Sequence, residues 1–314
     1  MTKLEEIRKF MEKLGLPGRD LYSLPDSPKH FPDGAHYRIE IAGIESPSAL
    51  ETLIAEAKKK NVPVHRVIAT VGGASYLTRE ELKNLAQLSR AEKFEVIMTI
   101  GHRLGWDAGA KQSMTPEGQQ VGFRHRGSDN ISYYLADVFR CVEQGLRGFL
   151  VYDEGVLFIM NKMREEGMLP KETIFKISVF TGYASAAGAR VVESMGANTF
   201  NPIADLSLPI LAGIRSAIRI PMDVYINVVD SFGGMNRSFE AAEIARVCAP
   251  CYFKFEPGVS EGVIYKPWVT RDFHDHLVKE KVKMASIVKE LVESMDPKIR
   301  LSAWGPGDLV LAQP

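Results

Sequence analysis

Short apolar runs alternate along the chain with longer stretches in which apolar residues recur every three or four positions. The short runs predict buried strands, and the longer stretches predict helices with one apolar face. Several of these helices carry start signals, such as Ser46 followed by Pro47 and the capping box of Thr78 with Glu81. The expected strands cover residues 37–42, 64–71, 94–100, 149–153, 174–180, 198–201, 223–229 and 251–256.

Eight strands, each followed by a helix, predict an α/β fold of the (β/α)8 (TIM) barrel type. An open doubly wound sheet is the alternative, and when it binds a dinucleotide it carries Gly-x-Gly-x-x-Gly after the first strand. Residues 42–47 read Ala-Gly-Ile-Glu-Ser-Pro instead, and the chain has no Gly-x-x-x-x-Gly-Lys-Ser/Thr motif. We therefore expect a barrel and no nucleotide cofactor.

The two ends of the chain fall outside this repeat. Residues 1–36 are expected to form a helix and a loop that pack on the barrel, which itself covers residues 37–260. The first helix begins with a capping box of Thr2 and Glu5 and has one apolar face. Residues 261–314 are expected to complete the barrel with a long charged helix over 271–295 and a tail, which either docks or stays free.

Composition narrows the choice of function. Acidic and basic residues number 39 each among 314, so the formal net charge is zero. A chain without a net basic field is not expected to bind nucleic acid or an anionic membrane. A charged N-terminus and the lack of an apolar run of ~18 residues indicate a cytoplasmic protein. The expected partners are a small-molecule substrate and a second copy of the chain, because barrels often dimerise.

The cysteines also indicate a cytoplasmic protein. Cys141, Cys248 and Cys251 are too few for a disulfide framework, which favours a reducing compartment. Cys248 and Cys251 form a lone Cys-x-x-Cys between a helix and the last strand, at the end of the barrel away from the expected site. We expect all three to be buried structural thiols.

Charged residues inside otherwise apolar strands are the strongest functional signal. Glu40, Lys176 and Lys254 lie in predicted strands, where an unpaired charge costs several kcal/mol. Glu40 has an alternative structural role, as an ion-pair partner of Lys254 or Arg38. Lys254 is flanked by two phenylalanines, so it suits either a salt bridge or Schiff-base chemistry.

Further polar residues follow the strands at the C-terminal face, where barrels carry their catalytic groups. His102, Asp153, Glu154 and Glu256 complete the catalytic candidates, with general acid/base roles expected. A divalent metal (Mg or Mn) is a further possibility, since such metals prefer oxygen ligands. The candidate ligands are Glu154, Asp230 and Glu256.

Three groups of residues are candidates for substrate binding. Gly233 and Gly234, with Arg237 nearby, follow the seventh strand, where barrels often bind phosphate through glycine amides; two tight turns are the alternative. Arg124 and Arg126 lie near the end of a long segment, 101–127, that is expected to cover the pocket as a lid and to clamp an anion; a solvated basic turn is the alternative. The strand residues Asn201 and Asn227 complete the set.

Three stretches, residues 122–129 (GFRHRGSD), 151–155 (VYDEG) and 201–207 (NPIADLS), resemble the peptidase U32 family. The resemblance spans roughly residues 122–256 and implies a barrel. Some members of that family look like iron–sulfur proteins with four ligating cysteines, but three cysteines in this chain do not support a cluster. No Ser/His/Asp or Cys/His pair for a peptidase can be placed in the sequence.

These observations favour an enzyme that acts on a small carboxylate or phosphate by proton transfer or carbon–carbon cleavage, of lyase or isomerase type. A hydrolase or peptidase is one alternative, as the U32 resemblance implies. A barrel that binds a small molecule without catalysis is the other.

Overall fold

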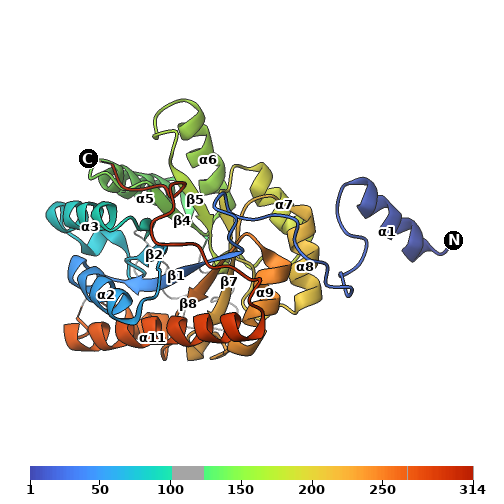
Figure 1. Cartoon of the computed structure of the whole chain (residues 1–314). Helices are drawn as coiled ribbons and strands as arrows, with labels where there is room; N and C mark the ends of the chain where they lie inside the picture. The colour runs from blue at the N-terminus through green and yellow to red at the C-terminus, as the bar shows by residue number, and fades with distance from the viewer. Residues whose placement is uncertain (101–123, 267, 314) are drawn as a thin grey trace.

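The computed structural model describes residues 1–100, 124–266 and 268–313. Eight parallel strands close into a barrel in chain order, which confirms the predicted (β/α)8 fold (Figure 1). The strands are β1 (Tyr37–Ile44), β2 (Arg66–Ala69), β3 (Glu95–Thr99), β4 (Gly148–Val151), β5 (Ile174–Ile177), β6 (Thr199–Phe200), β7 (Met222–Asn227) and β8 (Cys251–Phe255).

The helices lie outside the closed sheet, and all but the first surround it (Figure 1). They are α1 (Lys3–Lys13), α2 (Pro47–Lys60), α3 (Arg79–Ala91), α5 (Gly127–Val142), α6 (Glu154–Glu165), α7 (Ala186–Ser194), α8 (Leu208–Ala217), α9 (Ala241–Cys248), α10 (Glu261–Ile264) and α11 (Arg271–Met295). Short 3₁₀ turns are η1 (Ala74–Tyr76), η3 (Val179–Thr181), η4 (Asp230–Phe232) and η5 (Ser238–Glu240). No described helix combines the length and the apolar character that a membrane span requires.

Local signals set the helix starts as predicted. The Ser46 hydroxyl accepts a hydrogen bond from the amide of Ala49, with Pro47 in the first helical position of α2. Thr78 and Glu81 form a capping box at α3. Several strands are shorter than predicted; β5 ends at Ile177, because the Ser178 hydroxyl then caps the turn η3.

The core has two parts, as alternation along the strands requires. Outward-facing side chains, including Ile39, Ile41 and Val67, pack against the helices. A smaller cluster, which includes Ala42, Ile68 and Leu150, fills the interior of the barrel. The three cysteines are buried and unbonded, as expected.

The two chain ends behave differently. The capping box of α1 forms, but the helix has no buried residue, and Figure 1 shows it standing apart from the barrel. The expected packing is seen for the loop after it, where Phe31 and Ser27 are buried, and not for the helix. The C-terminal tail docks on the barrel: Asp308 pairs with the buried Arg38, and the amide of Gln313 donates to the carbonyl of Gly145.

Candidate active site

The inward-facing side chains of the barrel lie in layers stacked along its axis, which we call levels. Neighbouring strands pair Glu40 with Arg66 and Arg66 with Glu95, and in a barrel of shear 8 a level rises by one residue from each strand to the next. Each level therefore takes its inward side chains from alternate strands. Going toward the C-terminal end, successive levels hold Glu40, Ile97, Lys176 and Asp223; then Ile68, Leu150, Asn201 and Lys254; then Ala42, Thr99, Ser178 and Tyr225.

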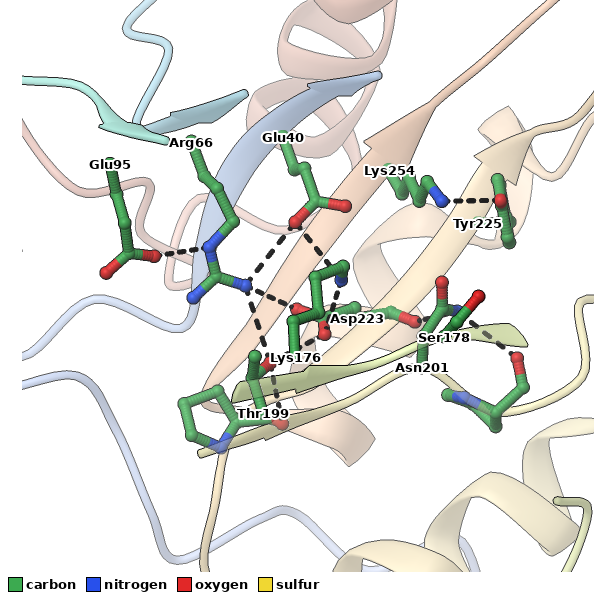
Figure 2. A network of polar contacts seen from close by, with 12 residues as sticks. Glu40, Arg66, Glu95, Lys176, Ser178, Thr199, Asn201, Asp223, Tyr225 and Lys254 are labelled. Carbon is green, nitrogen blue, oxygen red and sulfur yellow. Dashed lines mark hydrogen bonds and ion pairs between the residues drawn. The ribbon is translucent and has the colours of Figure 1, made fainter. Parts of the chain in front are cut away.

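The lowest of these levels contains a buried ion network (Figure 2). The Lys176 ammonium lies 2.5 Å from a carboxylate oxygen of Asp223 and 3.2 Å from one of Glu40. The Arg66 guanidinium lies 2.9 Å from Asp223 and 3.4 Å from Glu40, and its Nε donates to Glu95. Every charge in this network is therefore paired with a charge of opposite sign.

The network favours a structural role for Glu40 and Lys176. Burial lowers the pKa of Lys176, an effect that the carboxylates of Asp223 and Glu40 oppose. Burial also acts to raise the pKa of Asp223, but the charges of Lys176 and Arg66 outweigh it and keep that pKa below its usual value. The predicted positions of Glu40 and Lys254, inside the barrel on paired strands, are confirmed.

The ion-pair partners suggested for Glu40 are wrong. Neither Lys254 nor Arg38 pairs with it. Arg38 instead donates two hydrogen bonds to Asp308 of the tail, because its level lies at the N-terminal end of the barrel. Lys254 lies one level above Glu40, and its neighbours are Tyr225 and Glu256.

Those neighbours form a chain of hydrogen bonds toward the C-terminal end, which we call the upper relay. Lys254 Nζ donates to the Tyr225 hydroxyl over 2.5 Å, and that hydroxyl donates to Glu256 over 2.8 Å. On the other side, Lys281 Nζ donates to the Tyr265 hydroxyl and Tyr265 donates to Glu256, each over 3.1 Å. The carboxylate of Glu256 is thus held between two tyrosines, each of which accepts from a lysine.

The charges of the upper relay set its protonation. Burial acts to raise the pKa of Glu256, but Lys254 and Lys281 outweigh it and hold that pKa below its usual value, so the carboxylate is ionised at neutral pH. Burial raises the pKa of both tyrosines. Burial also lowers the pKa of Lys281 to about 8.

Gly43 makes the outer half of the relay possible. A Cβ at this position would lie 2.4 Å from the Tyr265 hydroxyl and 2.6 Å from Lys281 Nζ. Its φ of +76° also favours glycine, and the pairing of β1 shifts between Ala42 and Ile44. Tyr265 and Thr70 line a cavity of about 290 Å³ on the C-terminal side of the barrel, so the relay extends to that face.

The two predicted asparagines are buried beside these groups. Asn201 lies at the level of Lys254, and Figure 2 draws it close to Ser178, which lies at the level of Tyr225. Asn227 ends β7 and is 5% exposed. Among the described residues, neither Asn Oδ1 atom accepts a hydrogen bond, and the Thr99 hydroxyl, which is also buried, has no partner there.

The carboxylates after β4 have local roles. Asp153 caps α6 by accepting from the amide of Val156, and it also accepts from the amide of His125. Glu154 forms an ion pair with Arg124, whose guanidinium also donates to the carbonyl of Tyr152. This Arg124 side chain is therefore already engaged by a carboxylate, which does not fit the predicted anion clamp.

The rest of the predicted lid and anion clamp is only partly within the described residues. Arg126 is exposed at the start of α5. Residues 101–123 of the predicted lid lie outside the described residues, and the catalytic candidate His102 is among them.

The glycine-rich turn after β7 does not offer its amides to a phosphate. The amide of Gly233 donates to the carbonyl of Asp230, and the amide of Gly234 donates to that of Val229. Arg237 is buried and donates to the carbonyl of Leu206 and to Glu240. The predicted anion site is wrong here, because the glycines close a tight turn with positive φ, as the alternative interpretation had it.

The predicted metal ligands do not converge. Glu256 is held by the two tyrosines, Glu154 pairs with Arg124, and Asp230 is exposed in η4. Within residues 1–100, 124–266 and 268–313, no three His, Cys, Asp or Glu side chains are placed to hold a metal ion.

Sequence reasoning missed several residues of the two networks. Asp223 and Tyr225 alternate along β7 with Asn227, so a polar inward face could have been recognised there. Tyr265 and Lys281 could not have been found in this way, because they come from outside the strands.

Comparisons with known proteins give similarity of fold alone. No family model and no curated protein matches the sequence. The solved structures of similar fold include the YdjI aldolase from Escherichia coli K12, with 13% identity, a TM-score of 0.48, and coverage of 84% of this chain and 94% of the aldolase. A D-psicose 3-epimerase from Clostridium cellulolyticum H10 has 10% identity, a TM-score of 0.47 and coverage of 81% and 99%.

The U32 peptidase Mk0906 is also among these structures, with 12% identity, a TM-score of 0.42 and coverage of 74% and 96%. It is no more similar to this chain than the aldolase or the epimerase is.

Proposed function

We propose that this protein is a barrel enzyme of lyase or isomerase type, which binds a small carboxylate or phosphate beside Lys254 and moves a proton through Tyr225 to Glu256. The observation that carries the proposal is the hydrogen-bonded sequence Lys254–Tyr225–Glu256, with distances of 2.5 and 2.8 Å, in the C-terminal half of the barrel. Barrel enzymes place their chemistry at this end.

The roles follow from charge and burial. Lys254 is the end of the upper relay at which we place the substrate. Its ammonium there attracts an anionic group or polarises a carbonyl oxygen. The Tyr225 hydroxyl can accept a proton from the substrate as it passes its own to Glu256, because it donates to that carboxylate in the resting state. A low pKa keeps Glu256 ionised and therefore able to accept the proton.

Peptidase chemistry has less support. A thiol nucleophile requires a lowered pKa, whereas burial raises the pKa of Cys248 to about 12 and also raises those of Cys141 and Cys251. Within the described part of the chain, Ser178 accepts from the amide of Phe180 rather than lying against a histidine. The proposal therefore keeps to proton transfer.

Exchange of substrate hydrogen with solvent deuterium tests this function without knowledge of the product. Pools of small 2-hydroxy acids, 2-oxo acids and sugar phosphates are incubated with the protein in D₂O and followed by proton NMR. We expect deuterium uptake into at least one acid, and Lys254→Met should slow it by about 100-fold or more, the range for loss of a catalytic acid or base.

The matched control is Lys283→Met, because Lys283 is an exposed lysine of α11 whose partner is Glu280. This variant should exchange at the wild-type rate. Equal rates in the wild type and in a folded Lys254→Met protein would refute the proposal. Treatment with borohydride and a 2-oxo acid adds one detail: a mass increase that Lys254→Met abolishes would show that the lysine reacts as an imine.

A further inference from the structure

Asn201 presents one fixed hydrogen-bond acceptor beside the proposed site. Its Nδ2 donates to the carbonyl of Asp223 over 2.7 Å and to that of Pro202 over 3.2 Å. Two carbonyl acceptors fix the orientation of the amide, since only the nitrogen can donate to them. The Oδ1 atom therefore points away from both, and Asn201 is 1% exposed.

This Oδ1 atom accepts no hydrogen bond from the described residues. A buried acceptor without a donor is costly, and such groups in native proteins are usually satisfied by a partner or a ligand. The nearest level toward the C-terminal end carries the small residues Ala42 and Ser178 together with Thr99 and Tyr225. Figure 2 draws Asn201 and Ser178 near each other, and the strand register places them at the levels of Lys254 and Tyr225 respectively.

The charge nearby limits what the donor can be. Lys254 shares the level of Asn201, and Lys176 lies in the level below. An ammonium group on the ligand would face repulsion from Lys254, whereas a neutral hydroxyl would not. The hydroxyl of Ser178 accepts from the amide of Phe180 and has no acceptor for its own hydrogen among the described residues.

We infer that the substrate carries a hydroxyl group next to its anionic group, and that Asn201 selects it by accepting a hydrogen bond through Oδ1. The inference rests on the proposed function, because Lys254 is assigned there to the anionic group. It narrows the substrate from small anions in general to hydroxy acids and hydroxylated phosphates. Asn201 is then a specificity residue of the proposed reaction.

Two matched ligand pairs test the inference by binding alone. Lactate is compared with propionate, and 2-hydroxypropyl phosphate with propyl phosphate, using saturation-transfer NMR on the full chain to measure Kd. In the wild type, the hydroxylated member of at least one pair should bind about 10-fold or more tightly, the range for leaving one buried polar group unpaired. Alanine, in which an ammonium replaces the hydroxyl, should bind more weakly than lactate.

Variants distinguish selection of the hydroxyl group by Asn201 from attraction of the anionic group by Lys254. Asn201→Leu should bind lactate and propionate equally while it keeps the wild-type affinity for propionate. Lys254→Met should weaken both, and Lys283→Met neither. If Asn201→Leu does not fold, the smaller change Asn201→Ala makes the same comparison.

The outcomes distinguish the two proposals. Equal affinity for both members of each pair in the wild type overturns the role of Asn201 and leaves the anion site standing. A hydroxyl preference that survives in folded Asn201→Leu also overturns it. No binding of any of these anions by the wild type overturns both the inference and the proposed function.

Discussion

Acidification should weaken the fold through one histidine, His65, which ties the first strand to the C-terminal tail. The side chain is fully buried just before β2. Its Nδ1 accepts from the amide of Ile39 over 3.1 Å, so the hydrogen of the neutral ring lies on Nε2. Nε2 then donates to the carbonyl of Ala303, 3.0 Å away.

The magnitude follows from the pKa of this ring. Burial lowers the pKa of His65 from 6.5 to about 4, although the tail carbonyls oppose the shift. Because the folded value is the lower one, the unfolded chain binds the proton first as the pH falls. The stabilisation is therefore complete above pH 6.5 and is lost progressively down to about pH 4. At about 1.4 kcal/mol per unit, the loss is about 3 kcal/mol.

Urea unfolding followed by tryptophan fluorescence, in steps between about pH 7 and pH 4, measures this loss. His65→Gln removes the titration and keeps a side chain that can donate and accept. Its free energy of unfolding should be lower than that of the wild type near pH 7, but should fall by about 3 kcal/mol less over the same range. His36, whose pKa burial also lowers, is present in both proteins, so its effect cancels. Parallel pH profiles for the two proteins would refute the reasoning.

Three further changes test the interior of the barrel. Lys176→Met leaves Asp223 and Glu40 without their ammonium, so the free energy of unfolding in urea should fall by about 3–5 kcal/mol; an unchanged value would show that the network adds no stability. Gly43→Ala should lower the free energy of unfolding by about 1–3 kcal/mol, because the new Cβ meets Tyr265 and Lys281; calorimetry that finds wild-type stability would contradict this close approach. Lys281 becomes neutral as the pH rises through about 8, and loss of its charge makes Glu256 a stronger base. Deuterium exchange should therefore rise near that pH in the wild type and not in Lys281→Met.

The sequence alone determined the architecture and the side of each strand that carries charge. The repeat of strand and helix led to a barrel, because each local pattern depends only on near neighbours along the chain. Capping at Thr78 and Ser46 was predictable for the same reason. Alternation within the strand also placed Glu40 and Lys254 inside the barrel, and closure made their strands neighbours.

The tertiary structure alone decided which groups meet. Alternation shows that Glu40 points inward, but its level is shared with β5 and β7, so Lys176, 136 positions away in the sequence, joins Arg66 of the paired strand β2 as its partner. The glycines after β7 satisfy their own turn, which no count of glycines could reveal. The upper relay needs Tyr265 and Lys281 from beyond the last strand, and they reach Glu256 only because Gly43 leaves room for them. Contacts of this kind depend on the stagger of the closed sheet and on packing between distant segments, neither of which a local pattern contains.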